Sequence, residues 1–360
     1  SKISFQYKKN GTINIKDDGR GIPIDFHPKY KNKRALEVVL TTLHAGGKFN
    51  NNTYKTSGGL HGVGISVVNA LSSQLKVRVY KNGNVYKQEY SKGKVKTKVK
   101  IEKCSKKLKG TEITFLPDET IFDVTNYDPK KLHDFINMKS VLVGGTTIKF
   151  EIDKDLINDK TPNKKDFYYK NGIQDFFKLE YSNKDKLFEK DFSLRSKLNE
   201  TENFEIYMSF NKNESSSLKS YCNTIETPDG GSHEIGVKNG LIKALKLYGQ
   251  KNQFSKINNI NQNDLIDYND IIISIFINDP SFEGQTKKRV IMPSLQKEIE
   301  NKSQQEFLLW LNSNKKNSKI LLDSLIERAL LRTDLSKIQD LDRKNFKERN
   351  RLPGKLVDCS

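Results

Sequence analysis

A run of glycines that leads into a helix constrains this chain more than any other feature. The run consists of Gly58, Gly59, Leu60, His61, Gly62, Val63 and Gly64. Glycine has no Cβ, so backbone N–H groups can approach phosphate oxygens closely, and the start of a following helix adds a favourable dipole. Because an apolar pattern typical of a helix follows from Ile65 to Leu71, the sequence predicts a phosphate-binding loop at a helix start.

Two common phosphate motifs do not match this loop. The spacing of Gly59 and Gly64 is that of a P-loop, but Ile65 stands where that motif needs lysine. The dinucleotide fingerprint fails as well, since Val67 stands where its third glycine belongs. Considered alone, the loop is also compatible with glycines that only permit tight packing.

A second segment adds a polar group at the end of a strand. It contains Asp17, Gly19, Gly21, Ile22 and Pro23. An aspartate there can accept a hydrogen bond from an exocyclic amine such as that of adenine, and the glycines admit a flat ring. Asp-Gly pairs are also ordinary turns.

A cation follows the first predicted helix. This helix begins near Ala35 and carries Leu36, Val39, Leu40 and Leu43 at helical spacing, and Gly46-Gly47 ends it. Lys48 follows, suited either to a phosphate or to solvent.

Further along the chain, strands and helices alternate. Asn10-Gly11 predicts a hairpin turn, the apolar run 271–277 predicts a strand, and 233–248 predicts a helix. A helical stretch from 294 to about 350 is expected to break near 312–317. Residues 153–165 lose periodicity and suggest a domain boundary.

The charge balance leaves two interpretations open. The chain has 63 Lys+Arg and 44 Asp+Glu in 360 residues, a net charge of +19. This excess favours a polyanionic partner such as nucleic acid, but lysines scattered among asparagines also follow from a biased coding composition.

The three cysteines form no CxxC pair, which predicts neither a disulfide framework nor a zinc site. No signal peptide or bilayer-length apolar run is visible, so we expect a cytoplasmic protein.

Together these motifs resemble the ATP-binding domain shared by gyrase-like topoisomerases, heat-shock ATPase chaperones, histidine kinases and MutL. The stretches 35–48, 57–64 and 68–71 resemble the B subunit of bacterial type IIA topoisomerases in particular. In the second half, 227–234 resembles the transducer signature of that family, with Ser232 where threonine is more usual. Residues 352–359 resemble the entrance to the cleavage core. Within the family, 285–289 and 351–356 look closer to topoisomerase IV than to gyrase.

This resemblance implies an α+β fold. It implies a Bergerat-type (GHKL) ATPase α/β sandwich at 1–155, then a ribosomal-protein-S5-like βαβ transducer domain at 166–340 with long C-terminal helices. Residues 341–360 are then a linker into a TOPRIM cleavage core. The implied cofactors are ATP and Mg²⁺. The implied partners are DNA, the A subunit in an assembly of two A and two B subunits, and a second B subunit upon ATP binding; no membrane is involved.

Residue roles follow from the same resemblance. Asp17 would bind the adenine amine, Gly19 and the segment Gly21 to Pro23 would line the base pocket, and Thr111 would support it. Lys48 and the loop Gly58 to Gly64 would hold the phosphates. Gln285 and Lys287 would contact the γ-phosphate and act in catalysis. Two departures are visible: Asp18 stands where asparagine is common, and Lys87 where many members have arginine, which is not an equivalent group.

The resemblance also places two catalytic groups outside the sequence. The general-base glutamate and the asparagine that holds Mg²⁺ would fall roughly ten to fifteen residues before residue 1. We therefore expect the intact protein to be an ATP-hydrolysing topoisomerase, the chain alone to have little turnover, and no metal site within it. The alternatives are a gyrase B subunit, another GHKL ATPase such as a chaperone or mismatch-repair clamp, and a non-catalytic DNA-binding module.

Overall fold

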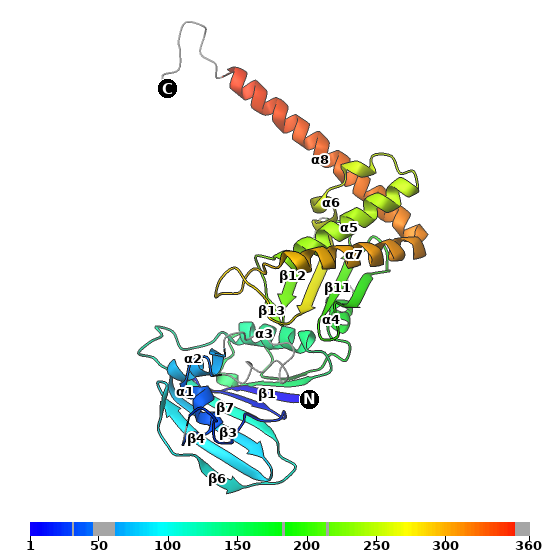
Figure 1. Cartoon of the computed structure of the whole chain (residues 1–360). Coiled ribbons are helices and arrows are strands. Elements are labelled where there is room, and N and C mark those ends of the chain that lie inside the picture. The colour runs from blue at the N-terminus through cyan, green and yellow to red at the C-terminus, as the bar shows by residue number, and fades with distance from the viewer. Residues whose placement is uncertain (31, 46–61, 182–183, 214–215, 350–360) are drawn as a thin grey trace. The chain divides into compact units, whose positions relative to one another are not determined.

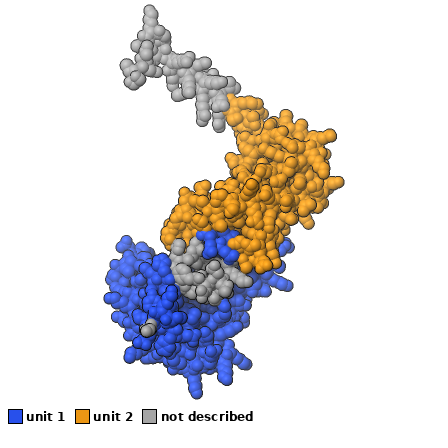
Figure 2. Space-filling model, viewed as in Figure 1, with its two compact units in different colours: residues 1–182, 222–225, 276–280 blue, residues 183–221, 226–275, 281–360 orange. Residues whose placement is uncertain are grey.

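The computed structural model describes residues 1–30, 32–45, 62–181, 184–213 and 216–349, with side chains of the last helix as far as residue 338. The chain divides into two compact units (Figure 2). Unit 1 comprises residues 1–182, 222–225 and 276–280, and unit 2 comprises residues 183–221, 226–275 and 281–360.

Unit 1 is built on a mixed sheet of nine strands in the order β5-β4-β3-β7-β2-β1-β8-β9, with β6 also paired to β4. The strands are β1 Lys2–Tyr7, β2 Ile13–Asp17, β3 Ser72–Lys81, β4 Asn84–Ser91, β5 Lys94–Val95, β6 Lys100–Lys103, β7 Gly110–Pro117, β8 Thr147–Ile152 and β9 Lys164–Phe167. Strands β1 and β8 pair in parallel. The other neighbouring strands of this sheet pair antiparallel. The central strand β2 therefore lies between β1 and β7, which places its carboxyl end beside the start of β7.

Helices cover one face of this sheet (Figure 1). They are α1 Ala35–Thr41, α2 Gly64–Ala70 and α3 Pro129–Leu142. The 3-10 turn Lys154–Leu156 and helix α4 Ile173–Glu180 follow later in the chain. The apolar side of α1 packs with alternate residues of β3, forming a core with Leu36, Leu40, Leu75, Val77 and Val79. Alternation along β3 and helical spacing along α1 bring these residues to one interface.

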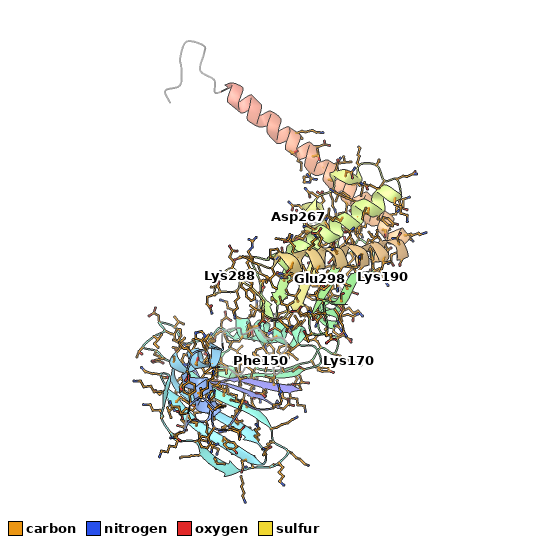
Figure 3. All side chains as sticks on the ribbon, viewed as in Figure 1. Phe150, Lys170, Lys190, Asp267, Lys288 and Glu298 are labelled. Atoms are coloured by element: carbon orange, nitrogen blue, oxygen red, sulfur yellow. The ribbon has the colours of Figure 1, made fainter. Side chains whose placement is uncertain are left out.

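A second core lies under α3. Phe5 of β1 stacks on Phe150 of β8, with ring centroids 5.9 Å apart, and Phe167 of β9 completes the aromatic cluster. Phe150 is labelled in Figure 3. Leu132 and Ile136 of α3 pack against it. Asp128 caps α3, since its carboxylate accepts hydrogen bonds from the N–H groups of the first turn.

Unit 2 contains most of a second sheet, in the order β10-β11-β14-β12-β13. The strands are β10 Phe192–Lys197, β11 Asn203–Phe210, β12 Ser217–Cys222, β13 Ile225–Glu226 and β14 Asn269–Phe276. The helices are α5 Ser232–Lys251, α6 Gln262–Ile266, α7 Pro293–Ser313 and α8 Lys315–Arg349, with a 3-10 turn at Ile257–Asn259. Aromatic side chains pack α7 against the sheet. The ring centroids of Phe307 and Phe192 lie 4.8 Å apart, and those of Trp310 and Phe210 lie 5.4 Å apart.

Helix α8 is held to this unit along its first half. Leu321, Leu322 and Leu325 are buried. The Arg328 guanidinium lies 3.7 Å from the ring centroid of Tyr268, and Arg332 donates to both carboxylate oxygens of Asp264 at 2.9 and 3.1 Å. A bidentate pair of this kind fixes direction as well as distance, so it orients the helix.

Most predicted elements are confirmed. Gly11 turns the β1–β2 hairpin with φ +78°, β14 coincides closely with the predicted strand, and the long helical stretch breaks at Asn314 between α7 and α8. One expectation is wrong. Helix α1 ends at Thr41, so Leu43 lies beyond it and is exposed. The predicted domain limits stay a prediction; in the structure, β9 pairs with β8 and unit 1 continues to residue 182.

Among the described residues, none of the helices has the length and apolar character that a bilayer crossing requires.

Helices α5 and α7 approach closely because two glycines of α5 face α7. A Cβ on Gly240 would lie 2.5 Å from the carbonyl oxygen of Glu300, and one on Gly236 would lie 2.6 Å from that of Gln296. Both distances are shorter than any Cβ contact that packing tolerates, so the helices would have to move apart.

We predict that Gly240→Ala lowers the free energy of unfolding by about 1 to 3 kcal/mol through overpacking. Helix propensity alone would change it by roughly 1 kcal/mol in the opposite direction, so the sign identifies the cause. Urea unfolding measures the change. Leu247→Ala, on an exposed part of α5, is the control and should shift stability by less than about 0.5 kcal/mol. A stabilised Gly240→Ala variant would contradict the packing.

Candidate functional site

The predicted adenine-binding aspartate ends β2, where the chain leaves the sheet. Asp17 is half-buried, and its Oδ1 accepts the N–H of Gly19 at 2.8 Å. A Cβ on Gly19 would lie 2.7 Å from the same oxygen. The short turn therefore holds the carboxylate in one orientation, and a side chain at residue 19 would displace it.

The turn after β2 lies directly against the start of β7. Gly110 has φ +110°, and a Cβ there would lie only 2.0 Å from the carbonyl oxygen of Asp17. Gly21 has φ +76°, and its Cβ would lie 3.2 Å from the carbonyl oxygen of Gly110. These glycines let two backbone segments touch. Sequence reasoning missed Gly110, although a glycine directly before Thr111 at a strand start is a detectable signal.

The predicted supporting threonine contacts the same turn. The Thr111 hydroxyl accepts the N–H of Ile22 at 3.1 Å, and Thr111 is buried. Ile22 packs against the apolar cluster under α1, while Pro23 is exposed. The structure thus brings Asp17, Thr111 and the Gly19 to Pro23 turn together, and their role in nucleotide binding stays a prediction.

The glycine-rich loop is described only in its last part. Gly62 has φ +61°, Val63 precedes α2, and Gly64 is exposed as the first residue of that helix. Asn69 of α2 donates to the carbonyl oxygen of Leu40 at 2.8 Å, which ties α2 to α1. Lys48, Gly58, Gly59, Leu60 and His61 lie outside the described residues.

The predicted γ-phosphate residues belong to unit 2, in the segment between β14 and α7. This segment folds back on itself, because Glu283 N–H donates to Arg289 at 3.0 Å and Ile291 N–H donates to Ser281 at 2.9 Å. Lys287 stands at its tip with φ +58°, which is a left-handed conformation. Gln285 is exposed, and Lys287 is half-buried.

Backbone contacts fasten this segment to the turn before α5. The N–H of Asp229 donates to Lys288, labelled in Figure 3, at 3.1 Å. Ser232 N–H donates to the carbonyl oxygen of Val290 at 2.9 Å, and the Ser232 hydroxyl accepts the N–H of Met292 at 2.8 Å. A hydroxyl suffices for this contact, so serine fills the place where threonine is more usual. The residues around Lys287 are therefore positioned by the 227–232 turn.

His233 opens α5 as a buried structural residue. It is fully buried, and its Nε2 lies 3.2 Å from the Thr227 hydroxyl. Burial lowers the pKa of His233 to about 4, because the charged imidazolium would lose its hydration. No group of three or more His, Cys, Asp or Glu side chains suited to a metal occurs in the described part of the chain.

Comparison with known proteins decides the family. A model of the family described as histidine kinase-, DNA gyrase B-, and HSP90-like ATPase matches residues 1–121, and one described as DNA gyrase B matches residues 172–341. The chain is 40% identical to the B subunit of DNA topoisomerase 4 of Rickettsia bellii over 364 residues, covering 100% of this chain and 55% of the relative. It is 36% identical to the B subunit of DNA gyrase of Thermotoga maritima, covering 99% and 56%.

Among solved structures, it is similar to the topoisomerase IV ATP-binding domain of Francisella tularensis, in complex with a small-molecule inhibitor. The TM-score is 0.75 at 29% identity, covering 92% of this chain and 87% of that one. The chain belongs to the type IIA topoisomerase B-subunit family. It corresponds to the GHKL ATPase domain and the transducer domain of that family, which confirms the predicted fold class. The chain spans about half the length of the curated relatives it matches.

The buried histidine makes stability depend on pH. Between its unfolded pKa of 6.5 and its folded value of about 4, the unfolded chain binds a proton that the folded chain does not, so stability falls as the pH falls. We predict a loss of up to about 3 kcal/mol across this window. Urea unfolding at a series of pH values should show a shallower fall for His233→Gln. Carboxylates titrate in both proteins, so they cancel in the difference; parallel curves would contradict the assignment.

Proposed function

We propose that this chain is the ATP-binding and transducer part of a topoisomerase IV B subunit. In the whole protein it closes a dimer gate on DNA for strand passage, relaxation and decatenation. The observation that carries the proposal is the Asp17 turn, held against Gly110 and Thr111 with its carboxylate oriented. A carboxylate beside a flat, glycine-lined turn suits a purine with an exocyclic amine.

The Asp17 carboxylate keeps an acceptor for such a ligand. Its Oδ1 is used by Gly19, whereas Oδ2 makes no hydrogen bond to any described residue. Ile22 backs the turn with apolar surface. These residues fit an adenine ring, and we assign Asp17, Gly19, Gly21, Ile22, Pro23 and Thr111 to its binding.

We assign the phosphates to Lys48 and to the loop Gly58 to Gly64, and the γ-phosphate to Gln285 and Lys287. ATP supplies the phosphoryl group, and a lysine near it would stabilise negative charge that develops on transfer. The proposed Mg²⁺ ligand and general base lie upstream of residue 1, so neither is assigned to the described residues.

The proposed partners are DNA, a topoisomerase IV A subunit and a second B subunit, which joins when ATP orders the gate. The proposed location is the cytoplasm, at the nucleoid. The 40% identity to the Rickettsia bellii protein over the whole chain supports the proposal of a topoisomerase IV B subunit.

A gyrase B subunit is the second candidate, because the Thermotoga maritima gyrase protein also matches 99% of the chain. The whole protein, reconstituted with its A subunit, should relax and decatenate DNA without introducing negative supercoils. Gel assays on relaxed and on catenated plasmids separate the two, and ATP-dependent negative supercoiling would favour gyrase.

A chaperone or a mismatch-repair clamp is disfavoured, since residues 172–341 match the DNA gyrase B family model. A non-catalytic DNA-binding module would not bind ATP, so nucleotide binding separates it from the proposed function.

We predict that Asp17→Asn weakens binding of a non-hydrolysable ATP analogue by about ten- to a hundredfold. The amide can still accept from Gly19, but its NH₂ would oppose the donor amine of adenine, which costs about 1.5 to 3 kcal/mol. Isothermal titration calorimetry on the whole protein measures the change. Asp18→Asn, which installs the residue common in the family, is the matched control and should stay within about threefold. Equal affinities of wild type and Asp17→Asn would reject the adenine contact.

We predict that Lys287→Ala in the whole protein lowers ATP turnover by about a hundredfold or more, while binding of the analogue stays measurable. A steady-state ATPase assay measures it. The neighbouring Lys288→Ala is the control and should keep most of the activity. Unchanged turnover of Lys287→Ala would reject the role. In the same assay, residues 1–360 alone should show little turnover, and a rate equal to that of the whole protein would contradict the proposed upstream base.

A further inference from the structure

Half of one short segment of unit 1 is lysine. Residues 92–109 contain nine lysines and one acidic residue, Glu102, so 9 − 1 gives a net charge of +8 in 18 residues. The whole chain has 63 Lys+Arg in 360 residues. A general coding bias would spread lysine evenly, so the concentration in this segment needs another explanation.

The segment forms the outer edge of the unit 1 sheet. Strands β5 and β6 both pair with β4, and all nine lysines are exposed. Lys92 makes an ion pair with Asp118 at 2.9 Å. We call the remaining lysines, at positions 94–109, the lysine edge. None of them makes an ion pair with a carboxylate of the described residues.

The adjoining strands β4 and β3 place two more cations beside the lysine edge, and each of these has a carboxylate partner. Lys100 of β6 stands opposite Lys87 of β4, and Lys87 stands opposite Arg78 of β3. Like charges directly opposite in a sheet are destabilising. Glu102 pairs with Lys87 and Glu112 pairs with Arg78, which leaves Lys100 without a carboxylate at ion-pair distance in the described structure. Lys100 thus stands beside a second cation, Lys87, whose carboxylate partner is Glu102.

Protection of a sheet edge explains only part of this charge. Lysines on edge strands prevent pairing with other chains, which accounts for those of β5 and β6. However, Lys106, Lys107 and Lys109 follow β6 in the connection to β7, where no strand edge needs protection. The positive charge thus continues beyond the segment that edge protection requires.

We propose that the lysine edge is a docking surface for the phosphate backbone of duplex DNA. Lysine ammonium groups neutralise phosphates without reading bases. Residues 92–109 contain no aromatic side chain, so the platform on which unpaired bases stack is missing, which favours a duplex over a single strand. The choice of DNA as the polyanion rests on the proposed function. Within the lysine edge, Lys109 directly precedes Gly110, which contacts the Asp17 turn.

Two triple variants test the surface, and both leave Lys109 in place. One is Lys94→Gln, Lys96→Gln and Lys98→Gln. The other is Lys103→Gln, Lys106→Gln and Lys107→Gln, which lies mostly outside the strands and so keeps the test valid if the first variant unfolds. The control is Lys130→Gln, Lys131→Gln and Lys160→Gln, which removes the same charge from other exposed positions of unit 1.

The measurement is binding of a fluorescent 20-base-pair duplex by anisotropy, on the whole protein, between 50 and 200 mM salt. Each neutralised phosphate contact contributes about 0.9 to the slope of log affinity against log salt. Because each lysine-edge variant loses three lysines, we expect its slope to be shallower than that of wild type by about 2 to 3. Over this fourfold rise in salt, the affinity of the variant should therefore fall by up to about 40-fold less than that of wild type. The control should keep the wild-type slope.

Several outcomes would overturn the proposal. Equal effects of the control and of the lysine-edge variants would show a response to net charge alone. Loss of binding to polyglutamate with unchanged duplex binding would indicate an acidic protein partner, and a larger effect on a single-stranded probe would reject the duplex. Binding of the ATP analogue is measured in parallel and should be unchanged. If all variants and wild type fail to bind the analogue, the proposed function fails, while the duplex slopes still decide the docking surface.

Discussion

The proposed nucleotide site depends on the contact between the backbone of Gly110 and the carbonyl of Asp17. Sheet order places the end of β2 beside the start of β7, and the two segments can touch there because Gly110 has no Cβ. Once they touch, the Thr111 hydroxyl reaches the N–H of Ile22 and the Asp17 carboxylate is held by Gly19. One steric constraint therefore orients the polar groups, and no long-range charge pairing is required.

Unit 2 uses the same kind of backbone contact to hold the segment that carries Gln285 and Lys287. Gly231 has φ +129°, and a Cβ there would lie 2.3 Å from the carbonyl oxygen of Val290. This approach fastens the segment that carries Gln285 and Lys287 to the start of α5, where His233 is buried. The conformation of the Lys287 segment is thereby linked to α5, which packs against α7. A change at that segment would act on a helix pair that has little room to adjust.

The sheet of unit 1 separates two chemistries. Its helix-covered face and the turn after β2 combine apolar packing with a few oriented polar groups, which suits a small ligand. Its outer edge carries a dense array of lysines without oriented partners, which suits an extended polyanion. The net charge of +19 is thus not uniform along the chain. A solvated lysine array needs only exposure, whereas the Asp17 turn needs a precise backbone, and this explains why one lies on an edge and the other at a strand junction.

Patterns along the chain were enough to predict the motifs, the family that they resemble and most helices and strands. Periodicity and glycine placement depend on neighbours along the chain, so α2, α5 and β14 lie where the patterns predicted. The predicted extension of α1 to Leu43 was wrong, because helical spacing does not reveal where a helix loses its packing partner. Only the tertiary structure decided that Gly110 lies against Asp17 and that Ser232 supports Met292. Only strand pairing placed Lys100 beside Lys87. These contacts join residues that are distant in the chain. They depend on sheet order and on close backbone approach, and no local pattern encodes either.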